Sequence, residues 1–336
     1  MISSRLMMVK RVLLFLVLLL SMASMASDKI NDGHLAIYMK LPLLFNDYNS
    51  LLKLTGGDYI YPGSFTMDDK NNIYVQYIFE PKQNDNIIVS YDKHGKYLGY
   101  HKIASGGKGG AGEGIAVINN ESGEKIVYVI SNDGMLQSYL LSDQPFGGNL
   151  PRKSSIFLKG YNQLSFHNGN FLIESYNGPR TIKNSRNNLV IYSKDLEVIR
   201  RITLPTEYSG YIVKYSNSTA SLFNKRQGLA LSAHFFVASY GAYYNHEMSE
   251  TPDKFQGVRV FSLSGRMLYE DIIKPKLFMD YLINNNLSVS RVENEGVFVD
   301  DEYIYQMYVY SDRYHQATSR KEGIVILKSA IQLLID

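Results

Sequence analysis

The sequence predicts an all-β protein built from repeated four-stranded units. Helical periodicity is almost absent along the 336 residues, and short runs rich in Ile, Val, Tyr and Phe alternate with turn residues. Such β-branched and aromatic runs, 126–130 and 303–310 among them, are typical of strands. Pairs such as Asp133-Gly134 and Asn168-Gly169 separate the runs and suit tight hairpins.

A repeated layout of these strands predicts the architecture. In five segments, a polar or glycine residue followed by a small residue opens a first strand, and three further strands follow. The opening strands are expected at 63–67, 113–117, 162–166, 227–231 and 295–299. Four strands in about 40–50 residues are typical of a β-propeller blade. We therefore predict a five-bladed β-propeller; six blades, a two-sheet sandwich and a β-solenoid are the alternatives.

The later units are spaced more widely than the first three, which indicates insertions at Pro205–Arg226 and Tyr240–Gln256. The fifth unit lacks a clear outer strand of its own. We expect the N-terminal segment Leu35–Leu41 to supply it and close the last blade. Pairing the first strand of the chain with the last removes the free edges of the sheets.

The N-terminus has the order of a secretory signal. Met1–Arg11 is basic, Val12–Leu20 is apolar, and small residues lead to Ala26. We predict a signal peptide at 1–26, a single propeller domain at 27–336, and an exported protein that is periplasmic or secreted. The alternative, a membrane anchor, fits poorly because the apolar run is shorter than the ~20 residues that span a bilayer.

Charge and cysteine content exclude several classes of protein. The net charge of +3 resides in Arg5, Lys10 and Arg11, and the remaining Lys and Arg residues match the 32 Asp and Glu. Nucleic-acid binding driven by counterion release is therefore not expected. The chain has no Cys, which excludes disulfides and thiol catalysis. We expect a monomer that does not span a membrane.

The first residues of the five opening strands form a candidate site. If these strands line the central channel, their first residues lie at one end of it: Gly63, Glu113, Asn162, Gln227 and Glu295. Converging carboxylate and amide oxygens suit Ca²⁺, with Glu113 and Glu295 as candidate metal ligands and calcium as the candidate cofactor. Alternatively, these side chains cap strand ends and bond neighbouring backbone amides.

Two loops are further candidates for ligand binding. The run Gly106–Gly114 contains G-x-G-x-x-G, but a strand rather than a helix is expected after it, which argues against dinucleotide binding. We expect a mobile loop that brings Lys108 close to a ligand. Tyr240, Tyr243 and Tyr244 belong to a Tyr-dense loop, and tyrosine suits recognition of sugars or protein surfaces.

No catalytic constellation is recognisable. The seven histidines form no zinc-binding spacing, and there is no G-x-S-x-G nucleophile motif. The adjacent acids Asp68-Asp69 and Asp300-Asp301 fall at expected hairpin turns, where such pairs are typical of turn chemistry. We therefore expect binding rather than catalysis.

The run Gly112–Ile115 followed by Tyr128–Ser131 resembles the propeller of helveticin-J-like bacteriocins, of the teichoic-acid biosynthesis protein C family and of phage receptor-binding proteins. The stretch Glu293–Gly296 is similar to their late Glu-x-Glu-Gly element, whereas Lys108 stands where they carry a histidine. The resemblance extends over residues 55–328. It implies a secreted or surface propeller that engages cell-wall or envelope glycans, and it carries over no catalytic residue.

The sequence thus favours an exported, carbohydrate-binding recognition module that binds an envelope glycan or surface protein through its loop face and central funnel. A Ca²⁺-dependent propeller hydrolase of the lactonase type is the main alternative, with the channel residues holding the metal. A bacteriocin-like secreted toxin is a further alternative.

Overall fold

The computed structural model describes residues 35–42, 59–80, 85–104, 111–131, 133–175, 187–205, 208, 213–214, 220–221, 226–241, 244–245, 256–311 and 322–331. The predicted signal peptide lies outside these residues. Within the described ranges, no helix is both long enough and apolar enough to cross a bilayer.

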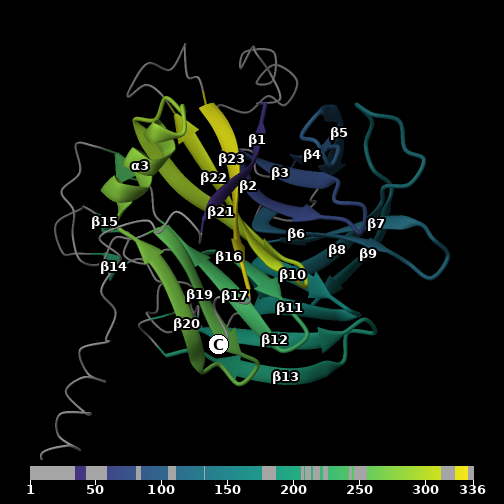
Figure 1. The fold of residues 1–336 in the computed structure, drawn as a ribbon. Coiled ribbons are helices and arrows are strands. Elements are labelled where there is room, and N and C mark those ends of the chain that lie inside the picture. The colour runs from purple at the N-terminus through teal and green to yellow at the C-terminus, as the bar shows by residue number, and fades with distance from the viewer. Residues whose placement is uncertain are drawn as a thin grey trace, which may run out of the picture.

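The predicted five-bladed propeller is confirmed: five antiparallel sheets surround one axis (Figure 1). Blade 1 contains β2 (Tyr59–Met67), β3 (Ile73–Glu80), β4 (Asp85–Tyr91) and β5 (Tyr97–Ala104). Blade 2 contains β6 (Ala111–Asn119), β7 (Lys125–Ser131), β8 (Met135–Leu140) and β9 (Arg152–Phe157). Blade 3 contains β10 (Gly160–His167), β11 (Asn170–Ser175), β12 (Asn188–Ser193) and β13 (Val198–Thr203). Blade 4 contains β16 (Arg226–Leu231), β17 (Phe235–Tyr240), β19 (Gln256–Ser262) and β20 (Met267–Ile273).

Blade 5 closes the ring as predicted. Its sheet runs from the inside outward as β21 (Arg291–Val299), β22 (Tyr303–Ser311), β23 (Glu322–Ala330) and β1 (Ala36–Leu41). The N-terminal strand β1 pairs antiparallel with β23, so that Ala36 lies opposite Lys328 and Leu41 opposite Ile324. The first and last strands of the described chain therefore share one sheet, and each protects the other's edge.

Both predicted insertions carry short strands. The segment between blades 3 and 4 contains the paired β14 (Val213–Lys214) and β15 (Ala220–Ser221). The β17–β19 connection contains β18 (Tyr244–Asn245), which pairs with β21 and extends blade 5 on its inner side.

A helix that the sequence analysis missed, α3 (Pro275–Asn284), connects blades 4 and 5. Proline at its first turn fits helix initiation, because that position needs no backbone donor. Phe278, Met279 and Leu282 are buried against β1, β21, β22 and β23, with the Phe278 and Tyr308 ring centroids 4.4 Å apart. The Tyr281 hydroxyl also donates to the Leu35 carbonyl at 3.0 Å, which ties the helix to the closing strand.

The two ends of the ring differ in how the innermost strands meet their connections. At one end, which we call the turn end, each innermost strand is joined to the next strand by a short turn: 68–72, 120–124, 168–169, 232–234 and 300–302. At the other end, the loop end, the innermost strands begin and longer connections lie, including 176–187, 241–255 and 312–321.

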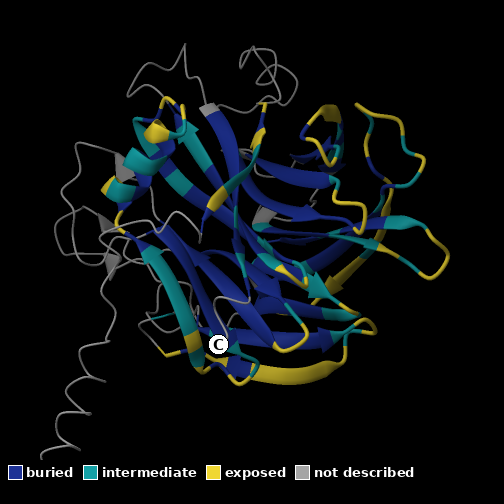
Figure 2. Ribbon diagram, viewed as in Figure 1, coloured by how far each residue is buried: buried dark blue, intermediate teal, exposed yellow. Residues whose placement is uncertain are grey.

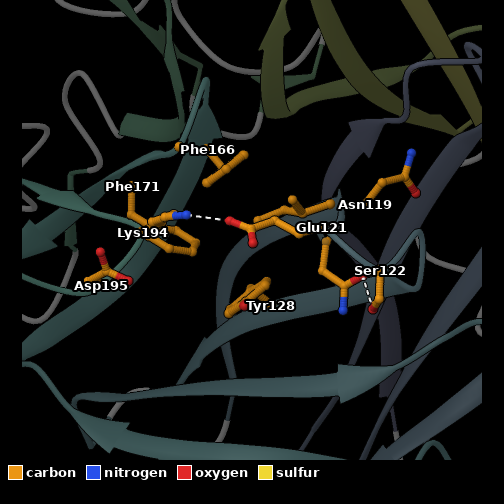
Figure 3. Close-up of a pocket in the computed structure, with 11 residues that line it drawn as sticks. Asn119, Glu121, Ser122, Tyr128, Phe166, Phe171, Lys194 and Asp195 are labelled. Carbon is orange, nitrogen blue, oxygen red and sulfur yellow. Dashed lines mark hydrogen bonds and ion pairs between the residues drawn. The ribbon is translucent and has the colours of Figure 1, made fainter.

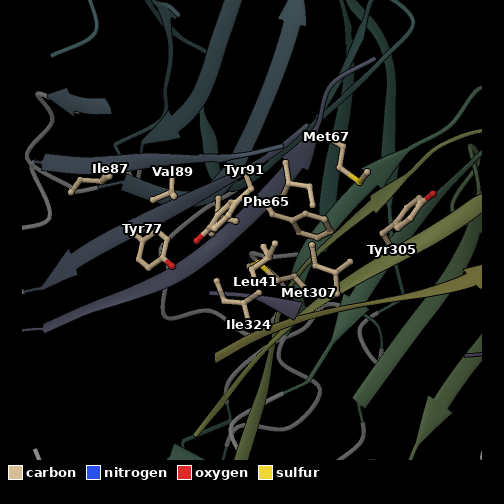
Figure 4. Packing of buried hydrophobic residues seen from close by; sticks show 13 residues of the cluster. Leu41, Phe65, Met67, Tyr77, Ile87, Val89, Tyr91, Tyr305, Met307 and Ile324 are labelled. Carbon is tan, nitrogen blue, oxygen red and sulfur yellow. The ribbon is translucent and has the colours of Figure 1, made fainter. Parts of the chain in front are cut away.

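The hydrophobic core lies between neighbouring blades. Figure 2 shows the inner strands buried and the outer strand β13 exposed. Between blades 1 and 5, Phe65 and Tyr91 pack with Met307 and Ile324, and Leu41 of β1 joins the same cluster (Figure 4). Burial of such side chains away from water supplies the main driving force for holding blades together.

Hydrogen bonds at the turn end confirm that Asp68 and Asp300, the first acid of each adjacent pair, stabilise hairpin turns. Asp68 accepts hydrogen bonds from the backbone nitrogens of Lys70 and Asn72 and from the Tyr74 hydroxyl. Its carboxylate also forms a 2.7 Å ion pair with Lys125 of the next blade. Although burial opposes the charged form, the bonds from Lys125 and Asn72 hold the pKa of Asp68 below its ordinary value. Asp300 repeats the arrangement, with bonds from Tyr303 and Tyr305.

Replacing Phe278 by Ala tests whether the helix stabilises the ring. Phe278 is fully buried, so Phe278→Ala should lower the free energy of unfolding by about 3–5 kcal/mol in urea denaturation. The control Ile283→Ala, on the exposed side of the same helix, should change it by about 0.5 kcal/mol or less. Equal effects of the two variants would show that α3 does not pack as described.

Candidate functional site

A register shift, or β-bulge, interrupts all five innermost strands, near the loop-end start of β6, β10 and β16 and at the middle of β2 and β21. The register shifts lie between Pro62 and Ser64, Ala111 and Ile115, Gly160 and Leu164, Arg226 and Gly228, and Asn294 and Gly296. Each shift contains the position that the repeat pattern placed at the opening of a blade. We call these five positions the bulge rim: Gly63, Glu113, Asn162, Gln227 and Glu295.

Bulged residues are unpaired in the ladder, and bulges re-aim side chains beside functional sites. In four of the five blades the residue that follows is small, and at Gly114 and Gly228 the missing side chain lets adjacent innermost strands approach closely. A Cβ at Gly114 would collide with the Leu164 backbone nitrogen, and one at Gly228 would lie 2.8 Å from the Val297 nitrogen. The Cα atoms of β6 and β16 come within 8 Å of each other although the strands are not neighbours, so the axis is narrow.

Glu113 and Asn162 form two hydrogen bonds that join blades 2 and 3. The Asn162 amide nitrogen donates to Glu113 Oε2 at 2.8 Å, and the Glu113 backbone nitrogen donates to Asn162 Oδ1 at 3.2 Å. Asn162 adopts a φ of 55°, which asparagine tolerates better than most residues. Asn162 therefore bonds a backbone amide of the neighbouring blade, as the alternative to metal binding predicted. Both side chains are half-buried, which leaves part of each facing solvent.

Gln227 links blades 4 and 5. It is fully buried, and its Nε2 donates to Glu293 Oε1 at 2.9 Å and to the Gly241 carbonyl at 3.4 Å. Its Oε1 accepts no hydrogen bond from the described residues. Sequence reasoning identified Gln227 but missed Glu293, because the contact depends on the stagger of β16 against β21.

Glu295 and Gly63 complete the bulge rim on blades 5 and 1. Glu295 is buried at the bulge of β21, between Asn294 and Gly296. A Cβ at Gly63 would collide with Ile78, so only glycine fits at this bulge without a shift. In the part of the chain that the structure describes, no group of three or more His, Cys, Asp or Glu side chains is placed to hold a metal. The assignment of Glu113 and Glu295 as calcium ligands stays a prediction.

A buried ion pair lies beside the bulge rim and was not anticipated from the sequence. Arg226 Nη2 lies 3.0 Å from Glu174 Oε2, and both side chains are inaccessible to water. Gln163 forms two hydrogen bonds with Arg226: its Oε1 accepts from Arg226 Nε at 3.0 Å, and its Nε2 donates to the Arg226 carbonyl at 2.8 Å. Because these residues come from different blades, the pair fixes blade 3 against blade 4.

Tyr240, a predicted ligand-binding residue, is buried at the end of β17. Its hydroxyl donates to the Tyr208 carbonyl at 2.8 Å, and the Arg259 guanidinium lies 4.9 Å from its ring centroid. Burial raises the pKa of Tyr240, although the positive charges of Arg226 and Arg259 oppose this. Tyr240 is therefore a buried residue of blade 4 in this structure.

The other predicted loop residues are placed only in part. Lys108 and Tyr243 lie outside the described residues. Tyr244 belongs to β18, where it lies opposite Val292 of β21 and so reaches the innermost strand of blade 5. The strand β6 begins at Ala111, inside the glycine-rich run, and continues to Asn119, so a strand rather than a helix follows Gly114, as predicted; this is inconsistent with a dinucleotide-binding helix start.

Substitutions in the buried Arg226–Glu174 ion pair test whether it holds blade 3 against blade 4. Arg226→Met should lower the free energy of unfolding by about 3–5 kcal/mol, because it leaves the Glu174 carboxylate buried without its guanidinium. The double variant Arg226→Met/Glu174→Leu should regain most of this loss in urea denaturation. Additive losses in the double variant would contradict direct coupling of the two charges.

Comparison with known proteins supports the fold. No family model matches the chain, and no curated protein matches it. The tail fiber of Staphylococcus aureus phage P68 is similar over 90% of this chain and 54% of the fiber chain, with 12% identity and a TM-score of 0.57. This chain therefore spans about half the length of that fiber chain. A GH43_1 enzyme from Xanthomonas citri matches over 86% of this chain and 90% of its own, with 10% identity and a TM-score of 0.44. The RS223 β-xylosidase matches over 82% and 93%, with 12% identity and a TM-score of 0.45. The tail-fiber match shows a shared fold at this level of identity.

Proposed function

We propose that the protein is an exported recognition module that binds an envelope glycan or surface protein at the loop end of its propeller. The observation that carries this proposal is the bulge rim. Five bulge positions surround a narrow axis at a similar level, and four of them carry a carboxylate or an amide. A closed ring of strands holds these groups rigidly, and rigid scaffolds with variable loops are suited to recognition.

The loop end supplies the remaining surface. Three long connections, 176–187, 241–255 and 312–321, lie at this end, whereas at the opposite end each innermost strand leads into a short turn, with Asp68 and Asp300 in two of these turns. Through β18, Tyr244 and Asn245 pair with the first two residues of β21, on the loop-end side of the rim residue Glu295. We infer that Tyr243, Tyr244 and Lys108 contribute contacts from these loops.

The chemistry of the rim suits a neutral, hydrogen-bonding ligand. Glu113 pairs with Asn162, and Glu293 pairs with Gln227, so each carboxylate already accepts from an amide. A ligand hydroxyl or peptide group can both donate to and accept from such pairs. Gln227 is fully buried, so the half-buried Glu113 and Asn162 are the rim side chains that a ligand can reach.

The family resemblance agrees with this function. Helveticin-J-like, teichoic-acid biosynthesis protein C-like and phage receptor-binding propellers are the modules that the glycine-rich approach to β6 and the Glu293–Gly296 stretch resemble. The phage tail fiber shares the fold over most of this chain. We propose that this protein belongs with them and that its signal peptide directs it to the periplasm or the exterior.

Retention on envelope material tests the proposal. Purified protein is mixed with sedimented envelope fractions from a Gram-positive and a Gram-negative bacterium, before and after periodate oxidation of their glycans. Wild-type protein should cosediment with at least one fraction. Glu113→Ala/Asn162→Ala should weaken retention at least about tenfold, or roughly 1.4 kcal/mol, because both members of one rim pair are removed.

Glu302→Ala is the matched control, since it removes one exposed carboxylate from a turn at the opposite end of the ring. It should bind as the wild type does, and thermal melting should verify that all variants are folded. Loss of retention after periodate indicates a glycan ligand, and unchanged retention indicates a surface protein. Equal retention of the rim variant and the wild type would refute the assignment of the rim.

A further inference from the structure

A hollow lies at the turn end, between blades 2 and 3, on the opposite side of the ring from the loop end (Figure 3). The β6–β7 turn forms one wall, and the β10–β11 and β12–β13 turns form the other. Its volume is about 650 Å³, within the range of pockets that hold small ligands.

Three aromatic rings from the two blades form its floor. Phe171 is only 2% exposed and lies at the base, with its ring centroid 5.0 Å from that of Tyr128 and 4.9 Å from that of Phe166. The planes are tilted by 58° and 59°, so the rings make a shallow apolar trough rather than a parallel slot. Tyr128 and Phe166 are half-buried, which leaves part of each ring facing the hollow.

The rim of the hollow is polar and carries both signs of charge. Lys194 Nζ lies 2.5 Å from Glu121 Oε1 and bridges the two walls. The two side chains are 60% and 88% exposed, so the pair is worth little and can be rearranged by a ligand. Asp195, Asn119 and Ser122 add further oxygen and amide groups around the same opening.

The buried Asp68–Lys125 contact that joins blades 1 and 2 has no equivalent from Asn120 at this hollow. Between blades 1 and 2, the carboxylate of Asp68 reaches across to Lys125. Asn120 occupies the equivalent place in the β6–β7 turn, as its hydrogen bonds with the Glu124 backbone show. Its amide donates to Glu124 within its own turn at 2.9 Å and not to blade 3.

We propose that this hollow is a second, saccharide-binding site. A pyranose ring presents C–H groups on its faces, which the electron-rich faces of aromatic rings attract, and hydroxyls at its edge that both donate and accept. The aromatic trough and the mixed rim match these two features. A phosphate-bearing ligand would meet the carboxylates of Glu121 and Asp195 with one ammonium to offset them, which disfavours it. The site does not depend on the function proposed for the loop end.

Calorimetric titration with three soluble tetrasaccharides tests the proposal: cellotetraose, chitotetraose and maltotetraose. At least one should bind the wild type. Phe166→Ala and Lys194→Ala should each weaken its affinity at least about tenfold, because one removes part of the trough and the other removes the rim donor. Phe157→Ala is the control for loss of a phenyl ring, since this side chain is 60% exposed on β9. Lys93→Ala is the control for loss of an exposed ammonium group, since Lys93 lies in the β4–β5 turn of blade 1, away from the hollow.

Binding of none of the three tetrasaccharides would overturn the proposal. So would unchanged affinity in Lys194→Ala and Phe166→Ala. Lys194 is a surface residue, so its variant stays informative even if Phe166→Ala proves unstable. The rim variant Glu113→Ala/Asn162→Ala should bind the tetrasaccharide as the wild type does, which separates failure of this site from failure of the loop-end function.

Discussion

Closure of the ring by β1 is the constraint on which the rest of the structure depends. Pairing of β1 with β23 supplies the outer strand of blade 5, and Leu41 enters the core between blades 5 and 1. Hydrogen bonds anchor both ends of the segment: Tyr281 donates to the Leu35 carbonyl, and Tyr91 donates to the Pro42 carbonyl at 3.0 Å. Without this strand, β23 would expose an unpaired edge, and blades 5 and 1 would lose part of their shared core.

A closed ring gives the bulges their significance. Because the innermost strands run in the same direction around one axis, and each bulge position lies four to six residues before the end of its strand, the five positions lie at a similar level in the ring. At Gly114 and Gly228, the absence of a Cβ atom allows the innermost strands of neighbouring blades to approach each other closely. Polar pairs between neighbouring blades, and the buried Arg226–Glu174 ion pair beside them, fix the rim in place. At the turn end, beside the hollow above Phe171, Asn120 stands in place of the acid that joins blade 1 to blade 2.

The sequence predicted the elements that repeat and missed those that occur once. The strand openings and the hairpin acids recur along the chain, so local sequence patterns were sufficient to predict them. The closing role of 35–41 followed from the outer strand that the fifth unit lacks. Helix α3 occurs once and is only ten residues long, although Pro275 and the spacing of Phe278, Met279 and Leu282 were signals for it. The pairing of Arg226 with Glu174, and of Gln227 with Glu293, depends on how adjacent blades are staggered, which periodicity does not encode. The aromatic hollow combines residues of two blades and was likewise invisible to a strand-by-strand analysis.

The most direct test of ring closure uses the absence of cysteine from this chain. Ala36 and Lys328 lie opposite each other in the β1–β23 pair, and Cα atoms of opposed residues are about 4.5–5.5 Å apart, within reach of a disulfide. The variant Ala36→Cys/Lys328→Cys should form an intramolecular disulfide on mild oxidation, detected by mass spectrometry and by a higher melting temperature. The pair Ala36→Cys/Ala330→Cys, displaced by two residues along β23, should not form one. Failure of the first pair to crosslink, or equal crosslinking of both pairs, would contradict a propeller closed by its N-terminal strand.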